Sequence, residues 1–185
     1  KSLNKKKNLG LKTLIELWDI QNNITTYHLG YMLGPRINAG GRVGKSTHGA
    51  NLLLNKNSKE AFQISLELNN SNKERQILES ELLNDILDKK YGLTDDPVIV
   101  LHGENWHEGI IGIIAARIKE KYNKPTFIIS TKSSLGKGSA RSIYGFDIGT
   151  AVIAAVQDKI LIRGGGHKMA AGFTLGVNKI EDFKN

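Results

Sequence analysis

The sequence predicts an α/β protein in which a long connecting helix is followed by a compact α/β domain with a mixed sheet. Between residues 50 and 91, apolar residues recur every four to five positions among charged and polar ones, which is typical of a half-exposed helix or helix pair. After residue 97, short apolar segments alternate with helical ones, the order expected of a strand–helix–strand domain. Residues 11–18 predict a further short amphipathic helix.

The C-terminal half divides into short elements. Val98 to Leu101 is wholly apolar, like a strand that is buried on both faces of a sheet. Thr94 to Pro97 reads as a linker, so we place a domain boundary near residue 94. The expected strands are 98–101, 125–130, 137–143 and 171–175, and the expected helices are 109–122 and 148–157.

Composition narrows the class of protein. The chain has 185 residues, a formal net charge of +8 and no cysteine, which excludes a disulfide framework and favours a cytoplasmic protein. No apolar stretch approaches the roughly 20 residues of a bilayer-spanning helix, so no membrane partner is expected. The sequence begins at Lys1 without methionine, which suggests a segment of a larger protein.

The charge is unevenly distributed. Residues 1–50 carry eight Lys or Arg and two Asp or Glu, residues 51–96 carry six and nine, and residues 97–185 carry twelve and seven. Two basic regions therefore flank an acidic connector, which favours a polyanionic partner. A solvated basic surface that serves solubility is the alternative.

Arginine is scarce, with 6 Arg against 20 Lys. This favours guanidinium groups kept where a planar, bidentate donor is needed. Four of them lie in or beside stretches rich in glycine or other small residues: Arg36, Arg42, Arg141 and Arg163.

The segment 34–42 contains Pro35 and three glycines, which we expect to prevent a regular helix. Arg36, Asn38 and Arg42 would then lie on a constrained loop or helix start. Such a loop can direct two guanidinium groups and an amide at one ligand. A structural turn whose arginines pair with carboxylates is the alternative.

His107 lies just before the helix expected near Gly109. The N-terminus of a helix favours an anion, so His107 could donate a hydrogen bond to a phosphate there. In the alternative, Glu108 caps the helix and Trp106 packs in the core.

Ser139 and Arg141 are two residues apart and would share one face of a strand. A hydroxyl beside a guanidinium is a plausible phosphate clamp, because hydrogen bonds to charged groups contribute about 1.5–3 kcal/mol each.

The run from Arg163 to Gly172 begins with three consecutive glycines after the arginine. Gly164, Gly165 and Gly166 could expose their N–H groups in backbone conformations closed to other residues and so cradle an anion, with His167 as a further donor. A tight turn with a structural histidine is the alternative.

The sequence shows no constellation for catalysis. Two-metal hydrolysis needs carboxylates and histidines converging on paired ions, yet the chain has no Asp-x-Asp or Asp-His-His pattern. It also lacks Ser-His-Asp and Walker-type patterns. We therefore expect no catalytic or metal-binding residue, and a chain that holds a polyanion without cutting it.

Four segments described above closely resemble, in this order, motifs of the RecJ-type single-strand-specific exonucleases, a branch of the DHH phosphoesterase family. They are the segments of Arg36 to Arg42, of His107, of Ser139 to Arg141 and of Gly164 to Gly172. The resemblance covers nearly the whole chain. It implies that residues 1–50 are the C-terminal tail of the DHH catalytic domain, 51–94 the connecting helix region and 95–185 the DHH-associated substrate-binding domain.

The resemblance also implies a function for the whole protein: 5′→3′ hydrolysis of single-stranded DNA in repair and recombination. The manganese or magnesium ions would be bound by motifs that lie upstream of this sequence, so the chain alone is expected to be inactive and to bind no metal. A helicase or single-strand-binding protein is left open as a partner of the whole protein. Positions that match family contacts to DNA are Arg36, Arg42, Ser139, Arg141 and Gly164 to His167; His107 matches a motif residue.

Two other functions stay open. The first is another DHH-family phosphodiesterase that acts on short oligonucleotides or a cyclic dinucleotide. The second is an RNA-binding module like that of the alanyl-tRNA synthetases.

Overall fold

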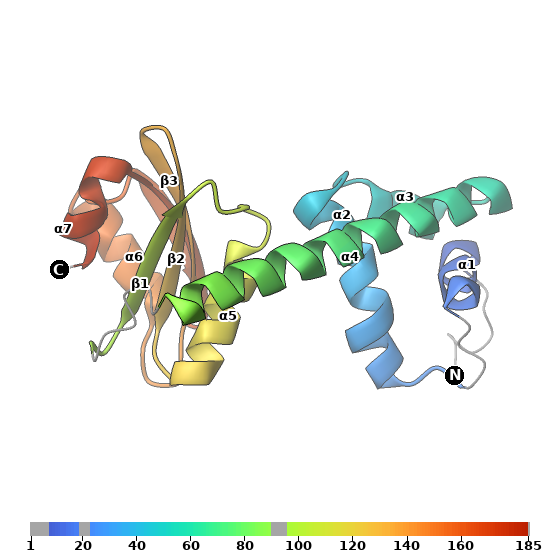
Figure 1. Cartoon of the computed structure of the whole chain (residues 1–185), viewed down its shortest axis with the longest axis horizontal. Coiled ribbons are helices and arrows are strands. Elements are labelled where there is room, and N and C mark those ends of the chain that lie inside the picture. Colours follow the sequence, from blue (N-terminus) through green and yellow to red (C-terminus); the bar gives the residue numbers. More distant parts are fainter. Residues whose placement is uncertain (1–7, 19–22, 90–95, 185) are drawn as a thin grey trace. The chain divides into compact units, whose positions relative to one another are not determined.

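The computed structural model describes residues 8–18, 23–89 and 96–184, and the chain divides into two units, residues 1–77 and 78–185 (Figure 1). Each unit has its own hydrophobic core. The boundary expected near residue 94 lies outside the described residues, and the division at residues 50 and 94 stays a prediction.

The first unit is helical. Its elements are α1 (Leu9–Leu17), the π-helix η2 (His28–Leu33), α2 (Gly34–Val43), α3 (His48–Leu54) and the first part of α4 (Ser58–Asp88). The Asn8 side chain accepts a hydrogen bond from the Leu11 N–H at 3.0 Å and so begins α1 earlier than expected. Leu14 and Ile15 of α1 are fully buried.

The long helical region is confirmed as a helix pair, α3 and α4. The break falls at residues 55–57, where the Asn57 side chain accepts hydrogen bonds from the Lys59 and Glu60 N–H groups and so caps α4. Ala61 and Leu68 of α4 are buried in the core of the first unit, and Ile86 in that of the second. One helix thus contributes apolar side chains to both cores.

Helix α2 contradicts the expectation for residues 34–42, because Gly34–Val43 is a regular α-helix. Pro35 occupies its first turn, where the missing N–H costs no hydrogen bond. Packing explains two of the three glycines: a Cβ at Gly34 would lie 2.8 Å from the Leu29 carbonyl oxygen and one at Gly40 would lie 2.7 Å from that of Lys45, whereas one at Gly41 would meet no atom within 4 Å. Close packing thus outweighs the low helix propensity of glycine.

The second unit contains a mixed five-stranded sheet, which confirms the expected fold class. Its order is β1-β2-β3-β5-β4; β1 and β2 are parallel and the other neighbours antiparallel. Helix α5 (Ile111–Tyr122) connects the parallel pair, and α6 (Ile148–Gln157) precedes β4. The strands are β1 (Ile99–Glu104), β2 (Thr126–Lys132), β3 (Leu135–Arg141), β4 (Arg163–His167) and β5 (Ala170–Gly176).

The glycine run forms a strand, β4, rather than a loop. Within the described part of the chain, Gly145 is the glycine with positive φ, so Gly164, Gly165 and Gly166 do not use conformations closed to other residues. The expectation of a cradle built from unusual backbone angles is therefore wrong. The run pairs with β5 along its whole length.

The two helices of the sheet cover different strands on opposite faces. Helix α5 packs against Leu101 and Ile128, while α6 packs against Ala171 and Phe173. Contacts of α5 extend to β2 and β3, and those of α6 to β4 and β5. On the α5 side of β4 and β5, Arg163, His167 and Gly172 are exposed.

Among the described helices, none combines the length and the apolar character that a membrane span requires.

Candidate functional site

One face of β3, β5 and β4 gathers polar and basic side chains. Directly paired residues in a sheet point to the same face, and successive residues alternate between faces. Ser139 pairs with Gly172, which pairs with Gly165. The two neighbouring rows of paired residues are Lys137–Thr174–Arg163 and Arg141–Ala170–His167. We call this surface the open face; it consists of Lys137, Ser139, Arg141, Arg163, Gly165, His167, Ala170, Gly172 and Thr174.

On β3 and β5, the residues between those of the open face point into the core. Ala140, Ala171 and Phe173 are buried against α6, whereas Arg163, His167 and Gly172 are exposed. The same three strands therefore carry a hydrophobic core on one side and an accessible basic surface on the other.

The centre of the open face is bare backbone. A Cβ at Gly165 would meet no atom within 4 Å, and one at Gly172 would meet only the Gly138 carbonyl oxygen, at 3.9 Å. By contrast, a Cβ at Gly164 would lie 2.6 Å from the Val152 side chain, and one at Gly166 would lie 2.6 Å from the Ala171 Cα. Packing within the chain explains Gly164 and Gly166, while Gly165 leaves room for a ligand to approach the main chain.

Arg141 and Ser139 lie together at the edge of that floor. The Arg141 Nη1 lies 3.3 Å from the Ser139 Oγ and donates to the Ala140 carbonyl oxygen at 2.8 Å. A Cβ at Gly112, in the first turn of α5, would lie 2.9 Å from the Ser139 Oγ and 3.1 Å from the Arg141 Nη2. A guanidinium, a hydroxyl and the N-terminal turn of a 12-residue helix thus converge, and all three favour an anion.

The loop before α5 is held beside the open face by an ion pair. The Glu108 carboxylate lies 2.6 Å from the Lys137 ammonium group, with both side chains about half exposed. His107 is exposed, and its Nδ1 accepts a hydrogen bond from the Gly109 N–H at 3.1 Å. The neutral ring therefore carries its hydrogen on Nε2, which makes it a donor toward solvent or a ligand.

Two details of that loop differ from expectation. Helix α5 begins at Ile111 rather than near Gly109, and it has no side-chain cap, so Glu108 pairs with Lys137 instead. Trp106 packs against the α5 core, and its ring occupies the space that a Cβ at Gly103 would need. The core role for Trp106 is thus correct.

In the first unit, α2 separates the three residues expected to act together. Asn38 and Arg42 are four apart, so they share one side of the helix, and both are exposed. Arg36 points to the opposite side and is only 8% exposed.

Arg36 has structural partners within its own unit. Its Nη1 donates to the Met32 carbonyl oxygen at 2.6 Å, and its guanidinium lies 3.5 Å from the centre of the Trp18 ring. Burial, and secondarily the nearby charge of Arg75, lower the pKa of Arg36. This environment packs a cation against an indole in the interior and keeps Arg36 apart from Asn38 and Arg42.

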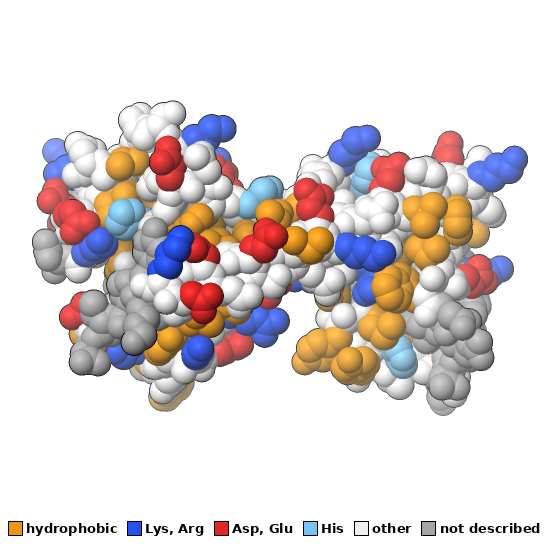
Figure 2. Space-filling model, in the orientation of Figure 1, with side chains coloured by type: hydrophobic (Ala, Val, Ile, Leu, Met, Phe, Trp, Pro, Cys, Tyr) orange, Lys and Arg blue, Asp and Glu red, His pale blue; other side chains and the backbone are white. Residues whose placement is uncertain are grey.

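The surface charge does not by itself reveal a binding area. On the side that Figure 2 shows, basic and acidic side chains are interspersed over each unit. The open face is recognised from strand register instead. Sequence reasoning missed Lys137, Thr174 and Gly172 because their place depends on which strands pair; period-two alternation within 135–141 would have indicated Lys137.

The metal ions expected for the whole protein find no donor set in the described part of this chain. Among those residues, no three His, Asp or Glu side chains lie close enough to hold an ion.

Comparisons with known proteins agree on which proteins the chain is similar to. Residues 95–185 match the family model described as the DHHA1 domain. The chain is 35% identical over 190 residues to the single-stranded-DNA-specific exonuclease RecJ of Bacillus subtilis, covering 99% of this chain and 24% of that protein. RecJ of Escherichia coli is 32% identical over 185 residues, covering 95% of this chain and 32% of that protein. The chain thus spans about a quarter to a third of the length of these relatives.

Solved structures of RecJ proteins are also similar to the chain. The crystal structure of RecJ from Thermus thermophilus in complex with Mg²⁺ matches with a TM-score of 0.85 and 32% identity, covering 96% of this chain and 27% of that one. A structure of exonuclease RecJ bound to manganese matches with a TM-score of 0.79 and 33% identity, covering 95% of this chain and 43% of that one.

Proposed function

We propose that this RecJ-like chain, which carries a DHHA1 domain at residues 95–185, is the substrate-binding part of a single-stranded-DNA exonuclease. The single observation that carries the proposal is the open face. There Ser139, Arg141 and His167 border a strip of bare backbone at Gly165 and Gly172, next to the N-terminal turn of α5.

These groups are suited to a phosphodiester backbone. Arginine can hold two phosphate oxygens at once, a hydroxyl and an imidazole N–H each donate one hydrogen bond, and a glycine strip lets the phosphate come close to the main chain. Contacts of this kind are made to phosphate rather than to base edges, so they bind without regard to sequence. Such binding fits an enzyme that must move through any sequence.

We further propose Asn38 and Arg42, in the first unit, and His107, beside α5, as separate contacts to the DNA. All three are exposed, and each offers a donor. Arg36 is assigned a structural role, because its guanidinium is buried against Trp18.

We place hydrolysis, its 5′→3′ direction and its manganese or magnesium ions in the parent protein, outside this chain. The solved relatives are RecJ structures with Mg²⁺ or manganese, and the described residues here provide no comparable donor cluster. The isolated chain is therefore expected to bind single-stranded DNA without cleaving it.

The binding surface is tested by the salt dependence of affinity. For a protein that contacts Z phosphates of a single strand, log K falls against log salt with a slope of roughly −0.7Z. Arg141→Ala should make the slope less steep by about 0.7 for one lost phosphate contact, as measured by fluorescence anisotropy with a 5′-phosphorylated ten-nucleotide strand. An unchanged slope would remove Arg141 from the surface.

Arg117→Ala is the matched control. It removes the same charge from α5, where Arg117 pairs with Glu79 at 3.2 Å rather than facing the open face. Its slope should equal that of the unmodified chain. Incubation with Mn²⁺ and with Mg²⁺ tests inactivity separately, and metal-dependent release of mononucleotides would contradict it.

A further inference from the structure

A hollow of about 330 Å³ lies at the end of β3, and phosphate binding makes no use of it. It is lined by residues 143–147, which follow β3, and by Lys168 and Met169, which join β4 to β5. This volume is at the lower end of the range for small-molecule sites.

The hollow is built from two segments that hydrogen bonds tie together. The Ser142 N–H donates to the Met169 carbonyl oxygen at 3.0 Å, and the Ser142 Oγ donates to the Phe146 carbonyl oxygen at 2.6 Å. The Ile148 N–H donates to the Lys168 carbonyl oxygen at 3.3 Å. Gly145, with a φ of +93°, supplies the turn that joins these residues. The walls are therefore held in place before any ligand arrives.

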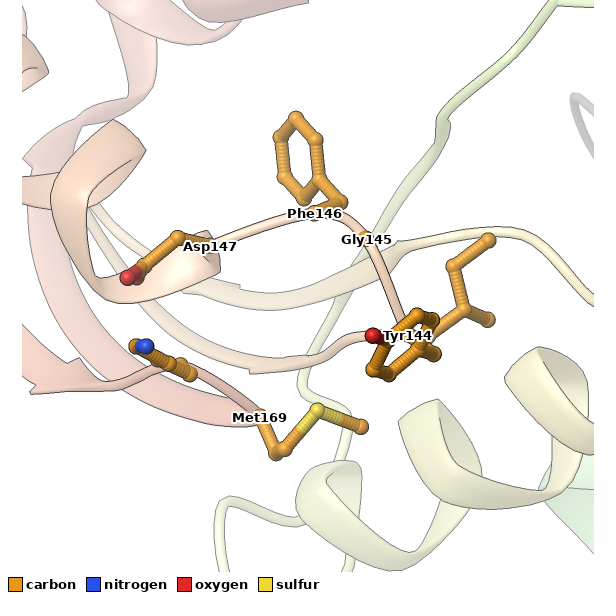
Figure 3. A pocket seen from close by; sticks show the side chains of 7 residues that line it. Tyr144, Gly145, Phe146, Asp147 and Met169 are labelled. Atoms are coloured by element: carbon orange, nitrogen blue, oxygen red, sulfur yellow. The ribbon is translucent and has the colours of Figure 1, made fainter.

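Two large side chains carried by these two segments are not buried. Tyr144 is 99% exposed and Met169 is 50% exposed. In Figure 3 both side chains lie on one side of the loop, whereas Phe146 points away from them. Phe146 packs against the α6 core. The Tyr144 ring and the Met169 thioether thus form a polarisable apolar surface that stays accessible in this unit.

The hollow continues a row of the open face. Arg141 pairs with Ala170, which pairs with His167. Tyr144 follows Arg141 by three positions, and Met169 directly precedes Ala170. A strand whose phosphate lies on this row therefore passes the chain segments that carry Tyr144 and Met169.

We propose that this hollow is a base-stacking subsite, in which Tyr144 and Met169 take a nucleobase of the strand whose phosphate lies at Arg141 and His167. The inference rests on the proposed function and names a part of the substrate that the open face does not contact. Base–aromatic stacking accepts every base, because each has a π-face. The carboxylate in the wall, Asp147, already caps α6 by accepting from the Thr150 N–H at 3.1 Å, which also favours stacking over recognition of base edges.

The experiment measures binding of the 185-residue chain to two 5′-phosphorylated ten-nucleotide strands. One carries normal bases, and the other carries base-free sugars throughout. Tyr144→Ala should weaken binding of the normal strand about five- to 150-fold, the range that stacking of one base contributes. The same variant should bind the base-free strand as the unmodified chain does, with an unchanged salt slope.

Tyr144→Phe keeps the ring and should restore binding of the normal strand. Tyr31→Ala is the matched control, because Tyr31 is a 73% exposed tyrosine in the other unit. A 2-aminopurine base in the normal strand gives a second readout, since stacking on Tyr144 should quench its fluorescence and Tyr144→Ala should relieve the quenching. Circular dichroism checks that each variant is folded.

The possible failures are distinguishable. If Tyr144→Ala binds both strands like the unmodified chain, or weakens both equally, the stacking subsite is overturned while the proposed function stands. If the unmodified chain binds neither strand at low salt, the proposed function fails and the subsite fails with it.

Discussion

The two glycine-rich segments of this chain use glycine in different ways. In α2, Gly34 and Gly40 allow backbone and side chains of the same unit to come close, and a Cβ at either position would meet a carbonyl oxygen. In the sheet, Gly165 and Gly172 face space that no described residue fills. Two glycines of α2 thus serve internal packing, whereas Gly165 and Gly172 form an accessible floor in the sheet.

The arginines show the same contrast. Arg36 is buried over Trp18, with its Nη1 bonded to a backbone carbonyl. Arg141 lies beside Ser139 at the edge of an exposed surface. An arginine in a glycine-rich segment is therefore a candidate for binding only when its own unit leaves the guanidinium accessible.

The sharpest test of the contrast lies within the glycine run itself. Gly166→Ala should lower the free energy of unfolding by about 1–3 kcal/mol, because its Cβ would overlap β5 near Ala171. Gly165→Ala should change stability by no more than about 0.5 kcal/mol, since its Cβ enters open space, but it should weaken binding of single-stranded DNA. Urea unfolding and anisotropy measure the two effects. Equal destabilisation by both variants would erase the distinction.

The two arginines of α2, Arg36 and Arg42, provide the next test. Arg36→Ala should destabilise the first unit by about 2 kcal/mol, through loss of packing and of the contact with Trp18. Arg42→Ala removes the same group from the exposed side and should leave stability within about 0.5 kcal/mol. Thermal unfolding of the two variants measures this difference. A stable Arg36→Ala variant with weakened DNA binding would place Arg36 in the binding surface instead.

A smaller effect on DNA affinity is expected when the Ser139 hydroxyl beside Arg141 is removed. Ser139→Ala should reduce DNA affinity by about 1.5 kcal/mol, the lower value for a hydrogen bond to a charged group, without altering the salt slope. Titration by anisotropy at several salt concentrations measures both quantities. Ser142→Ala is not a suitable control, because that hydroxyl bonds to the Phe146 carbonyl oxygen in the interior. Ser134→Ala, in the β2–β3 turn, is the better one.

The smallest expected effect concerns the ion pair between Glu108 and Lys137. Both side chains are half exposed, so Glu108→Gln should change stability by less than about 1 kcal/mol. The variant removes a negative charge beside the open face and should slightly strengthen DNA binding at low salt. The gain should vanish near about 1 M salt, where charges are screened within about 3 Å. A gain that persists at high salt would require a non-electrostatic cause.

Local signals in the sequence were sufficient for most of the second unit. The helix expected at 148–157 is confirmed at those bounds, because Asp147 caps it and its apolar spacing is regular. The apolar segments at 98–101 and 125–130 largely coincide with β1 and β2. Each of these signals acts within a few residues, so no knowledge of pairing was needed.

The errors arose where residues outside a segment decide its structure. In the helix at 34–43, a Cβ at Gly40 would lie 3.1 Å from the Leu68 side chain, and the strand at 163–167 pairs with β5, to which a two-residue turn joins it. The inward direction of Arg36 likewise depends on Trp18, which lies 18 positions earlier. Strand register, which defines the open face, has no signature within a single segment.

The two faces of β3 and β5 have different roles, and this determines which positions of these strands can tolerate substitution. Ala140, Ala171 and Phe173 are buried in the core, whereas Lys137 and Thr174, which lie on the opposite face of the same strands, are exposed and half-buried respectively. Substitutions should therefore be tolerated with a period of two along these strands. Selection can adjust affinity for the ligand at one set of positions while the other set keeps the domain folded, so binding strength and stability can evolve almost independently.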